Sequence, residues 1–335
     1  MTPFSYHRAA SVADAVAKLG SGGAFLAGGT NLLDHMRLGL RAPSHLVDVS
    51  RLPLAQISRN DDGVLHVGAL VRNSDMAAHA LVRQHQPLVV QALLAGASGQ
   101  LRNMATTGGN LLQRTRCLYF QDVSTPCNKR LPGSGCSARD GHGRSNALFG
   151  ASDACVAVNP SDLCVALAAL DVTVVVQGPA RGRHAGLAER RIPFADFHRL
   201  PGSTPDVDSN LADSELITAL EIAPLPWGQN AMYRKLRDRA SYAFALVSVA
   251  AALHVRGGIV QDVRLALGGV SHKPHRAHTA EAMLRGGAAS QQAFLAAADA
   301  ELAEARPGAD NAYKLPMLRN TIAAVLVSLA QGAVA

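Results

Sequence analysis

Four of the chain's five cysteines fall in one irregular stretch, with nine, eight and eighteen residues between them: Cys117, Cys127, Cys136 and Cys155. Four thiolates on irregular backbone can surround a metal centre, because loops tolerate the geometry that ligation imposes. Their spacing supports an iron–sulfur cluster, a zinc site and unrelated thiols about equally, although the tight knuckles usual for structural zinc are absent. An odd number of cysteines in a chain of this length argues against a disulfide-stapled domain.

Two segments with paired glycines echo each other: Gly28-Gly29-Thr30-Asn31-Leu32-Leu33 and Gly108-Gly109-Asn110-Leu111-Leu112. Paired glycines let the backbone reach positive φ and aim successive N–H groups at one point, and a helix that starts there adds its free N–H groups. Such a turn binds anions, most naturally phosphate, so two turns suit a diphosphate. Neither segment matches Gly-x-Gly-x-x-Gly, so an ordinary Rossmann site is not indicated, and two unrelated tight turns remain the alternative.

Alternating helices and strands are expected around these motifs. Ser11 is expected to cap a helix, residues 24–27 to form a short strand before the first turn, and residues 31–40 to form a helix after it. Residues 114–155 break the pattern, and so long a loop in a compact domain is usually functional or disordered. Regular structure is predicted to resume with a helix over residues 162–170.

Within that helix, Cys164 lies among apolar residues and is expected to pack as a small buried hydrophobe. The C-terminal part is predicted to contain a strand at 231–239, followed by residues 242–255, a glycine turn at 256–258 and a strand at 260–267. Helices are expected at 291–305 and 313–329.

The composition is that of a folded globular protein, with 48% hydrophobic and 17% charged residues in 335. This length predicts two or three domains. The net charge of +7 and pI near 9.5 suit a basic face for an acidic partner or an anionic cofactor better than nucleic acid, because no long Lys/Arg block occurs. Basic residues concentrate only around 128–130 and 181–183. We expect neither a membrane span nor an export signal in this chain.

Together these motifs resemble the flavoprotein subunits of the xanthine dehydrogenase and carbon monoxide dehydrogenase family of molybdenum hydroxylases. Residues 27–33 resemble their first FAD-diphosphate loop, and Thr106-Thr107-Gly108-Gly109-Asn110 resembles the second. Pro160-Ser161-Asp162 before an apolar helix and Tyr233-Arg234-Lys235 are similar to later stretches of those proteins. Four motifs in family order make the resemblance specific over nearly the whole chain.

The resemblance implies an α+β fold. Its FAD-binding domain, of the vanillyl-alcohol-oxidase/PCMH-like type, would comprise subdomains at 1–55 and 56–226, the second with the Cys-rich insertion at about 114–155. A smaller α+β domain with a short antiparallel sheet plus helices would follow at 227–335. The implied FAD-binding residues are Leu26, Ala27, Gly28, Gly29, Thr30, Asn31, Leu32, Thr106, Thr107, Gly108, Gly109, Asn110, Asp162 and Lys235.

The cysteine-bearing insertion is similar to that of the flavin subunit of bacterial periplasmic aldehyde oxidoreductases. It implies a [4Fe–4S] cluster on Cys117, Cys127, Cys136 and Cys155. It also implies a heterotrimer with a small two-[2Fe–2S] subunit and a large molybdenum-cofactor subunit, which carries out the aldehyde chemistry. This chain would hold no catalytic residue for that step and would pass electrons through FAD to an external acceptor.

The resemblance also implies a periplasmic location within an exported complex, with the cytoplasm as the alternative. Two other functions remain open from the sequence. One is a stand-alone FAD oxidoreductase of the vanillyl-alcohol-oxidase-like class, and the other is a zinc-stapled basic module that binds nucleic acid.

Overall fold

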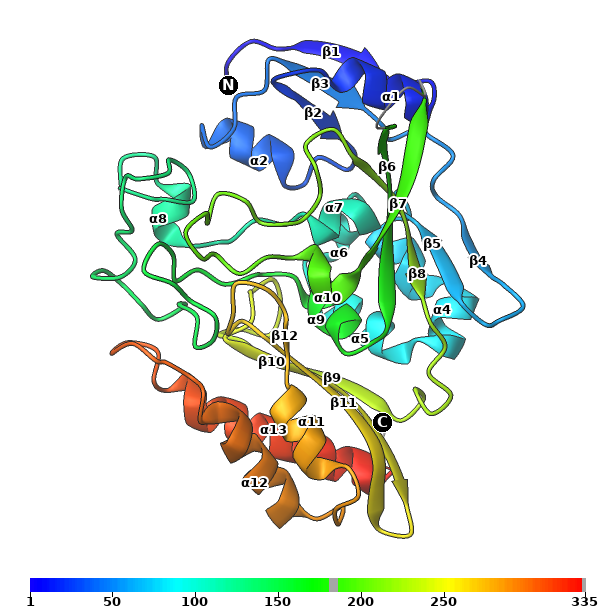
Figure 1. Cartoon of the computed structure of the whole chain (residues 1–335), viewed down its shortest axis with the longest axis vertical. Helices are drawn as coiled ribbons and strands as arrows, with labels where there is room; N and C mark the ends of the chain where they lie inside the picture. Colours follow the sequence, from blue (N-terminus) through cyan, green and yellow to red (C-terminus); the bar gives the residue numbers. More distant parts are fainter. Residues whose placement is uncertain (181–185, 333–335) are drawn as a thin grey trace.

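Three β-sheets follow one another along the chain, each covered by helices (Figure 1). The computed structural model describes residues 1–180 and 186–332. The basic segment 181–183 lies outside the described residues.

The N-terminal sheet is parallel and has the strand order β1-β3-β2. Ser11 caps its first helix, because the Ser11 hydroxyl accepts a hydrogen bond from the N–H of Asp14 at 3.1 Å. The elements are β1 (Ser5–Arg8), α1 (Val12–Leu19), β2 (Gly23–Leu26), α2 (Leu32–Arg37) and β3 (His45–Asp48).

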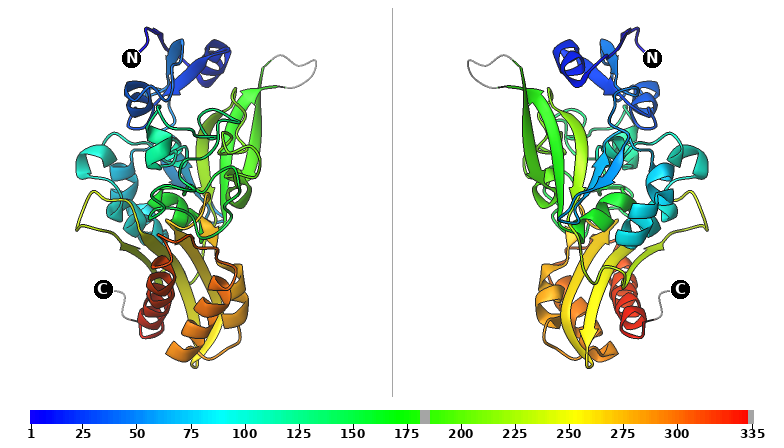
Figure 2. Two further views of the ribbon diagram at one scale, coloured as in Figure 1. Left: turned by 90° about the vertical axis from the view of Figure 1, so that its left-hand side faces the viewer. Right: turned by 90° about the vertical axis from the view of Figure 1, so that its right-hand side faces the viewer.

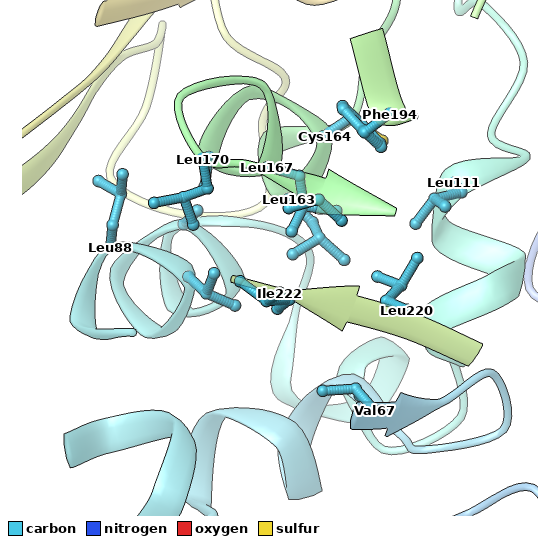
Figure 3. Close-up of a cluster of buried hydrophobic side chains, with 14 of the residues drawn as sticks. Val67, Leu88, Leu111, Leu163, Cys164, Leu167, Leu170, Phe194, Leu220 and Ile222 are labelled. Carbon is cyan, nitrogen blue, oxygen red and sulfur yellow. The ribbon is translucent and has the colours of Figure 1, made fainter. Parts of the chain in front are cut away.

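The second sheet is antiparallel, with the strand order β4-β5-β8-β6-β7. Its strands are β4 (Ile57–Arg59), β5 (Leu65–Gly68), β6 (Val172–Pro179), β7 (Leu187–Pro193) and β8 (Leu216–Ile222). The associated helices are α3 (Asn73–Ala78), α4 (Ala80–His85), α5 (Pro87–Ala95), α6 (Gly99–Arg102), α7 (Thr107–Leu111), α8 (Leu118–Gln121), α9 (Asp162–Ala168) and α10 (Phe194–Phe197). Helix α9 contributes Leu163, Cys164 and Leu167 to the largest core cluster (Figure 3), so the prediction for Cys164 is confirmed.

The C-terminal sheet is antiparallel, has the order β12-β11-β10-β9, and lies between its own three helices and the rest of the chain (Figures 1 and 2). Its elements are β9 (Ala231–Leu236), β10 (Val247–Arg256), β11 (Ile259–Gly268), β12 (His275–Arg276), α11 (His278–Leu284), α12 (Gln291–Leu302) and α13 (Lys314–Ala330). Val249 and Leu253 of β10 pack toward those helices, whereas Ala250 and Ala252 join the core around α9. The small side chains on the second face let α5 and α9 contact the sheet.

Several predicted elements end earlier in the structure: the strand expected at 231–239 is β9 (Ala231–Leu236), and the helix expected at 162–170 is α9 (Asp162–Ala168). The helix expected at 31–40 spans only Leu32–Arg37, since Gly39 adopts a φ of 72°. The stretch 114–155 is irregular as predicted, apart from α8. The boundaries predicted at residues 55 and 226 fall between sheets and stay a prediction. No helix in the described ranges is long and apolar enough to span a bilayer.

Candidate functional site

The first diglycine turn joins β2 to α2 and is pressed against the segment that leads to the second turn. A Cβ added at Gly28 would lie 1.9 Å from the carbonyl oxygen of Met104, so only glycine fits there. Gly29 has a φ of 72°, which L side chains rarely adopt. Among the described residues, the backbone N–H groups of residues 28–31 have no hydrogen-bond acceptor. They are therefore available to an anion.

The second diglycine turn is built differently, as the first turn of α7. Thr106 caps this helix, and its hydroxyl accepts a hydrogen bond from the N–H of Gly109 at 3.3 Å. The N–H of Thr107 donates to the carbonyl of Val71 at 2.9 Å, and that of Gly108 to the carbonyl of Ala69 at 2.8 Å. Most amides of this turn are therefore used inside the protein, and only Gly109 keeps a long, weak bond.

Two adjoining cavities meet at the turns. The first cavity, about 570 Å³, contains Ala27, Gly28, Gly29 and Leu32 in its lining. The second cavity, about 550 Å³, contains Asn110, Asp162 and Lys235. Their shared lining residues are Thr30, Asn31, Gly109 and Gln113. Each cavity has the size of a small-molecule site, and together they offer an elongated ligand two chambers with a waist at the glycine turns.

The structure brings together most of the residues that the sequence indicated. Thr106 and Gly108 also line the first cavity. Two residues line neither cavity. Leu26 packs against the small apolar cluster of Ala24, Met36 and Leu46. Thr107 is buried and donates its hydroxyl hydrogen to the carbonyl of Val71 at 3.0 Å. The assignment of all these residues to FAD stays a prediction.

Asp162 and Lys235 form an ion pair in the wall of the second cavity. The Lys235 ammonium donates to Oδ2 of Asp162 at 2.7 Å, and the Tyr233 hydroxyl donates to Oδ1 at 2.6 Å. Burial and the adjacent Asp162 raise the pKa of Tyr233, so this hydroxyl keeps its proton. The Lys235 side chain is only 3% exposed, so it is not an ordinary surface lysine. Both carboxylate oxygens of Asp162 already have protein partners.

A buried charge network that the sequence did not indicate borders the first cavity. The Lys129 ammonium donates hydrogen bonds to Asp208 and to the carbonyl of Pro205. The Arg114 guanidinium donates to Asp208 at 2.7 Å. Burial alone would raise the pKa of Asp208, but His272 and the charges of Lys129 and Arg114 outweigh burial and lower it. These residues are far apart in the sequence, so no local pattern could have revealed the network.

This network corrects the expectation of a basic surface at 128–130. Lys129 is only 2% exposed, and the Arg130 guanidinium donates to the carbonyls of Tyr119 and Phe120 at 2.8 Å. Lys129 therefore pairs with a carboxylate and Arg130 binds backbone carbonyls. Neither side chain contributes to a basic surface for an acidic partner. Lys129 lines the first cavity, which agrees with the other expectation, an anionic cofactor.

The four clustered cysteines line one small cavity of about 10 Å³, here called the cysteine cavity. All are free thiols, and Cys127 and Cys136 face each other across an isolated β-bridge. Burial raises the pKa of Cys155 to about 11 and that of Cys117 above its usual value. In residues 1–180 and 186–332, no group of three Cys, His, Asp or Glu side chains stands ready to hold a metal ion. Four cysteine thiols around one cavity are a donor set that suits an iron–sulfur cluster.

Comparison with known proteins defines the class. Residues 2–226 match the family described as the FAD binding domain in molybdopterin dehydrogenase, and residues 231–331 match the CO dehydrogenase flavoprotein C-terminal domain. The chain therefore belongs to the FAD-binding medium subunits of the molybdenum hydroxylase family. The predicted family, the α+β fold and the role as an oxidoreductase component are confirmed.

Individual proteins of this family are similar to the chain over most of its length. The chain is 50% identical to the aldehyde oxidoreductase FAD-binding subunit PaoB of Escherichia coli K12, over 97% of this chain and 98% of that protein. It is 27% identical to the carbon monoxide dehydrogenase medium chain of Hydrogenophaga pseudoflava, over 92% and 88% of the two chains. A solved carbon monoxide dehydrogenase structure from that organism superposes with a TM-score of 0.76, at 26% identity and full coverage of both chains.

Proposed function

We infer that this chain is the electron-transfer subunit of a heterotrimeric molybdenum-dependent aldehyde oxidoreductase, carrying a [4Fe–4S] cluster in addition to FAD. The similarity to an aldehyde oxidoreductase subunit over nearly the full length supports the substrate class. The observation that carries the cluster is that four cysteines, from positions as far apart as Cys117 and Cys155, line one cavity. The partners would be a small two-[2Fe–2S] subunit and a large molybdenum-cofactor subunit.

FAD would occupy the two adjoining cavities, with its diphosphate at their waist. The unpartnered N–H groups of residues 28–31 would donate to the phosphate oxygens, and the weakly bound N–H of Gly109 lies on the shared wall. The adenosine half would lie in the first cavity and the isoalloxazine ring in the second.

Bound FAD supplies the redox chemistry, accepting electrons and passing them on. Lys235 would hold a positive charge beside the ring and so favour a negative charge there. Asp162 and Tyr233 fix the Lys235 ammonium in place, which makes them positioning residues in this proposal. Asp162 would thus act through Lys235 more than by direct contact with the cofactor.

The mouth of the second cavity marks where electrons would leave. Tyr242 and Phe244 line this cavity and are 57% and 49% exposed. Tyr242 also has a φ of 51°, a strained conformation for a residue with a side chain. A quinone, ferredoxin or similar external acceptor would approach the ring here. The complex is proposed to work in the periplasm, exported with a partner subunit, and cell fractionation distinguishes this from the cytoplasm.

Flavin, iron and sulfide analysis of the complex purified from its host tests this function. We expect one FAD, four iron and four sulfide in this chain beyond those of the small subunit. Cys127→Ser should lower the iron content and bleach the cluster absorbance, whereas Cys164→Ala, which changes the buried thiol of α9, should leave both unchanged. Retained iron in Cys127→Ser, or aldehyde oxidation by this chain alone, contradicts the proposal.

A further inference from the structure

The segment that follows α7 runs directly from the flavin cavities to the cysteine cavity. Gln113 lines both flavin cavities, and Arg116 lines the second cavity. A small connecting cavity of about 150 Å³ adjoins the second cavity and is lined by Arg116 and Cys117. Cys117 also lines the cysteine cavity. Residues 112–116 therefore connect the end of α7 with the thiol of Cys117.

Arg116 is the side chain in this segment that touches the first diglycine turn. Its Nη2 donates to Oδ1 of Asn31 at 3.1 Å, and its guanidinium lies 5.3 Å from the centre of the Phe244 ring. The Nε atom is buried and has no hydrogen-bond partner in the part of the chain that the structure describes. Within the same ranges, none of the ion pairs within 4.0 Å involves Arg116.

A largely buried guanidinium without a carboxylate partner is costly unless an anion or strong acceptor completes its hydrogen bonds. Burial lowers the pKa of Arg116, and the charge of Asp34 offsets this effect only in part. The side chain borders the cavity that the flavin end of FAD would fill, next to the turn whose amides are unpartnered. A phosphate oxygen or a ring carbonyl would supply the missing acceptor.

We propose that Arg116 couples the two cofactor sites, so that a cluster bound through Cys117 strengthens the binding of FAD. Ligation would fix the Cys117 backbone and thereby hold the neighbouring guanidinium against Asn31, ready for the dinucleotide. FAD would then bind without the loss of conformational entropy that fixing the Arg116 side chain otherwise requires. By linkage, bound FAD stabilises the cluster to the same extent. This inference rests on the proposed function, since it requires both cofactors.

A double-mutant cycle in the complete complex tests the coupling. The dissociation constant of FAD is measured by recovery of flavin fluorescence on dilution, for wild type, Cys117→Ser, Arg116→Gln and the double variant. Cys117→Ser should weaken FAD binding about tenfold when Arg116 is present and less than about twofold when it is replaced, because the coupling passes through the guanidinium. Oxidative removal of iron from the wild-type complex should reproduce the first effect without any substitution in the loop.

Controls separate coupling from loss of structure. Arg51→Gln removes an exposed arginine outside the four cavities and should leave FAD affinity unchanged. Arg116→Lys keeps the charge and should fall between wild type and Arg116→Gln. Equal effects of Cys117→Ser in both backgrounds, or FAD affinity unaffected by iron removal, overturn the coupling while leaving the proposed function intact. A wild-type complex with FAD but no extra iron overturns the proposed function and the coupling with it.

Discussion

The backbone N–H groups of the first diglycine turn have no partner among the described residues. Most of those in the second turn donate hydrogen bonds to Val71, Ala69 and Thr106. Gly28 is needed because an added Cβ would lie 1.9 Å from the Met104 carbonyl oxygen, whereas an added Cβ at Gly108 would lie 3.1 Å from the Ala69 Cβ, which a small shift relieves. The same sequence pattern thus serves two purposes. The first turn offers donors to a ligand, and the second shapes a rigid wall with Gly109 at the waist of the cavities.

The largest expected effect comes from a substitution in the residues that support the second turn. Ser161, the cap of α9, donates its hydroxyl hydrogen to Asn110 at 2.6 Å, and the next residue is Asp162 of the buried ion pair. Asp162→Asn leaves the Lys235 charge uncompensated, so we expect the free energy of unfolding to fall by about 3–5 kcal/mol. Denaturant unfolding measures this change.

Asp171→Asn is the matched control for this prediction. Asp171 pairs with Arg264 but is 65% exposed, so its loss should cost less than about 1 kcal/mol. Equal costs of the two variants would mean that the buried pair does not brace the wall.

Gly28→Ala attacks the first turn. The new methyl group would collide with a backbone carbonyl that cannot move aside alone, so we expect a loss of about 1–3 kcal/mol in unfolding free energy. The turn would also shift, and FAD content by absorbance should drop sharply. Gly99→Ala, where nothing lies within 4 Å of the added Cβ, is the control and should retain full flavin. Full flavin in Gly28→Ala would refute the close approach.

Acid should loosen the second turn. His198 Nε2 lies 2.9 Å from the carbonyl oxygen of Leu111, the last residue of α7, and burial lowers the pKa of His198 to about 4. A folded-state pKa below the unfolded value near 6.5 means that the stabilisation is complete above pH 6.5 and is lost as the pH falls toward 4. We expect a loss of about 1 kcal/mol between pH 6.5 and 5.5 from this group.

Unfolding free energies at several pH values check this slope, and His198→Gln should flatten it while keeping a donor to Leu111. His35, on the helix after the first turn, also has a pKa lowered to about 4, by burial first and then by Arg114. The slope that survives in His198→Gln is therefore assigned to other groups such as His35. An unchanged slope would contradict a buried neutral His198.

Gly108→Ala should have the smallest effect. Its added Cβ would lie 3.1 Å from the Ala69 Cβ, a contact that a shift of a few tenths of an ångström relieves. Helix α7 also favours alanine over glycine. We expect less than about 1 kcal/mol of change in thermal unfolding, with FAD retained. A loss as large as that of Gly28→Ala would erase the difference between the two turns.

Local patterns predicted much of the fold and part of the site. Hydrophobic periodicity and capping located α1 with Ser11, and the paired glycines located both turns. Strand β7 escaped prediction because its run Leu187–Pro193 is an edge strand with exposed Glu189, Arg190 and Arg191, so one face lacks apolar residues.

The partners of the site residues could not be predicted, because tertiary contacts decide them. Lys129 meets Asp208 across 79 positions and Arg116 meets Asn31 across 85, distances at which no spacing rule operates. Glycine pairs likewise indicate close backbone approach but do not reveal which amides stay unpartnered.

A structure of the loaded complex, with density for the dinucleotide, would show directly where FAD binds. We expect the diphosphate against the amides of residues 28–31 and beside Gly109, with the isoalloxazine ring next to Lys235 and adenosine in the first cavity. A diphosphate away from the first diglycine turn, or a ring in the first cavity, would contradict this placement of FAD.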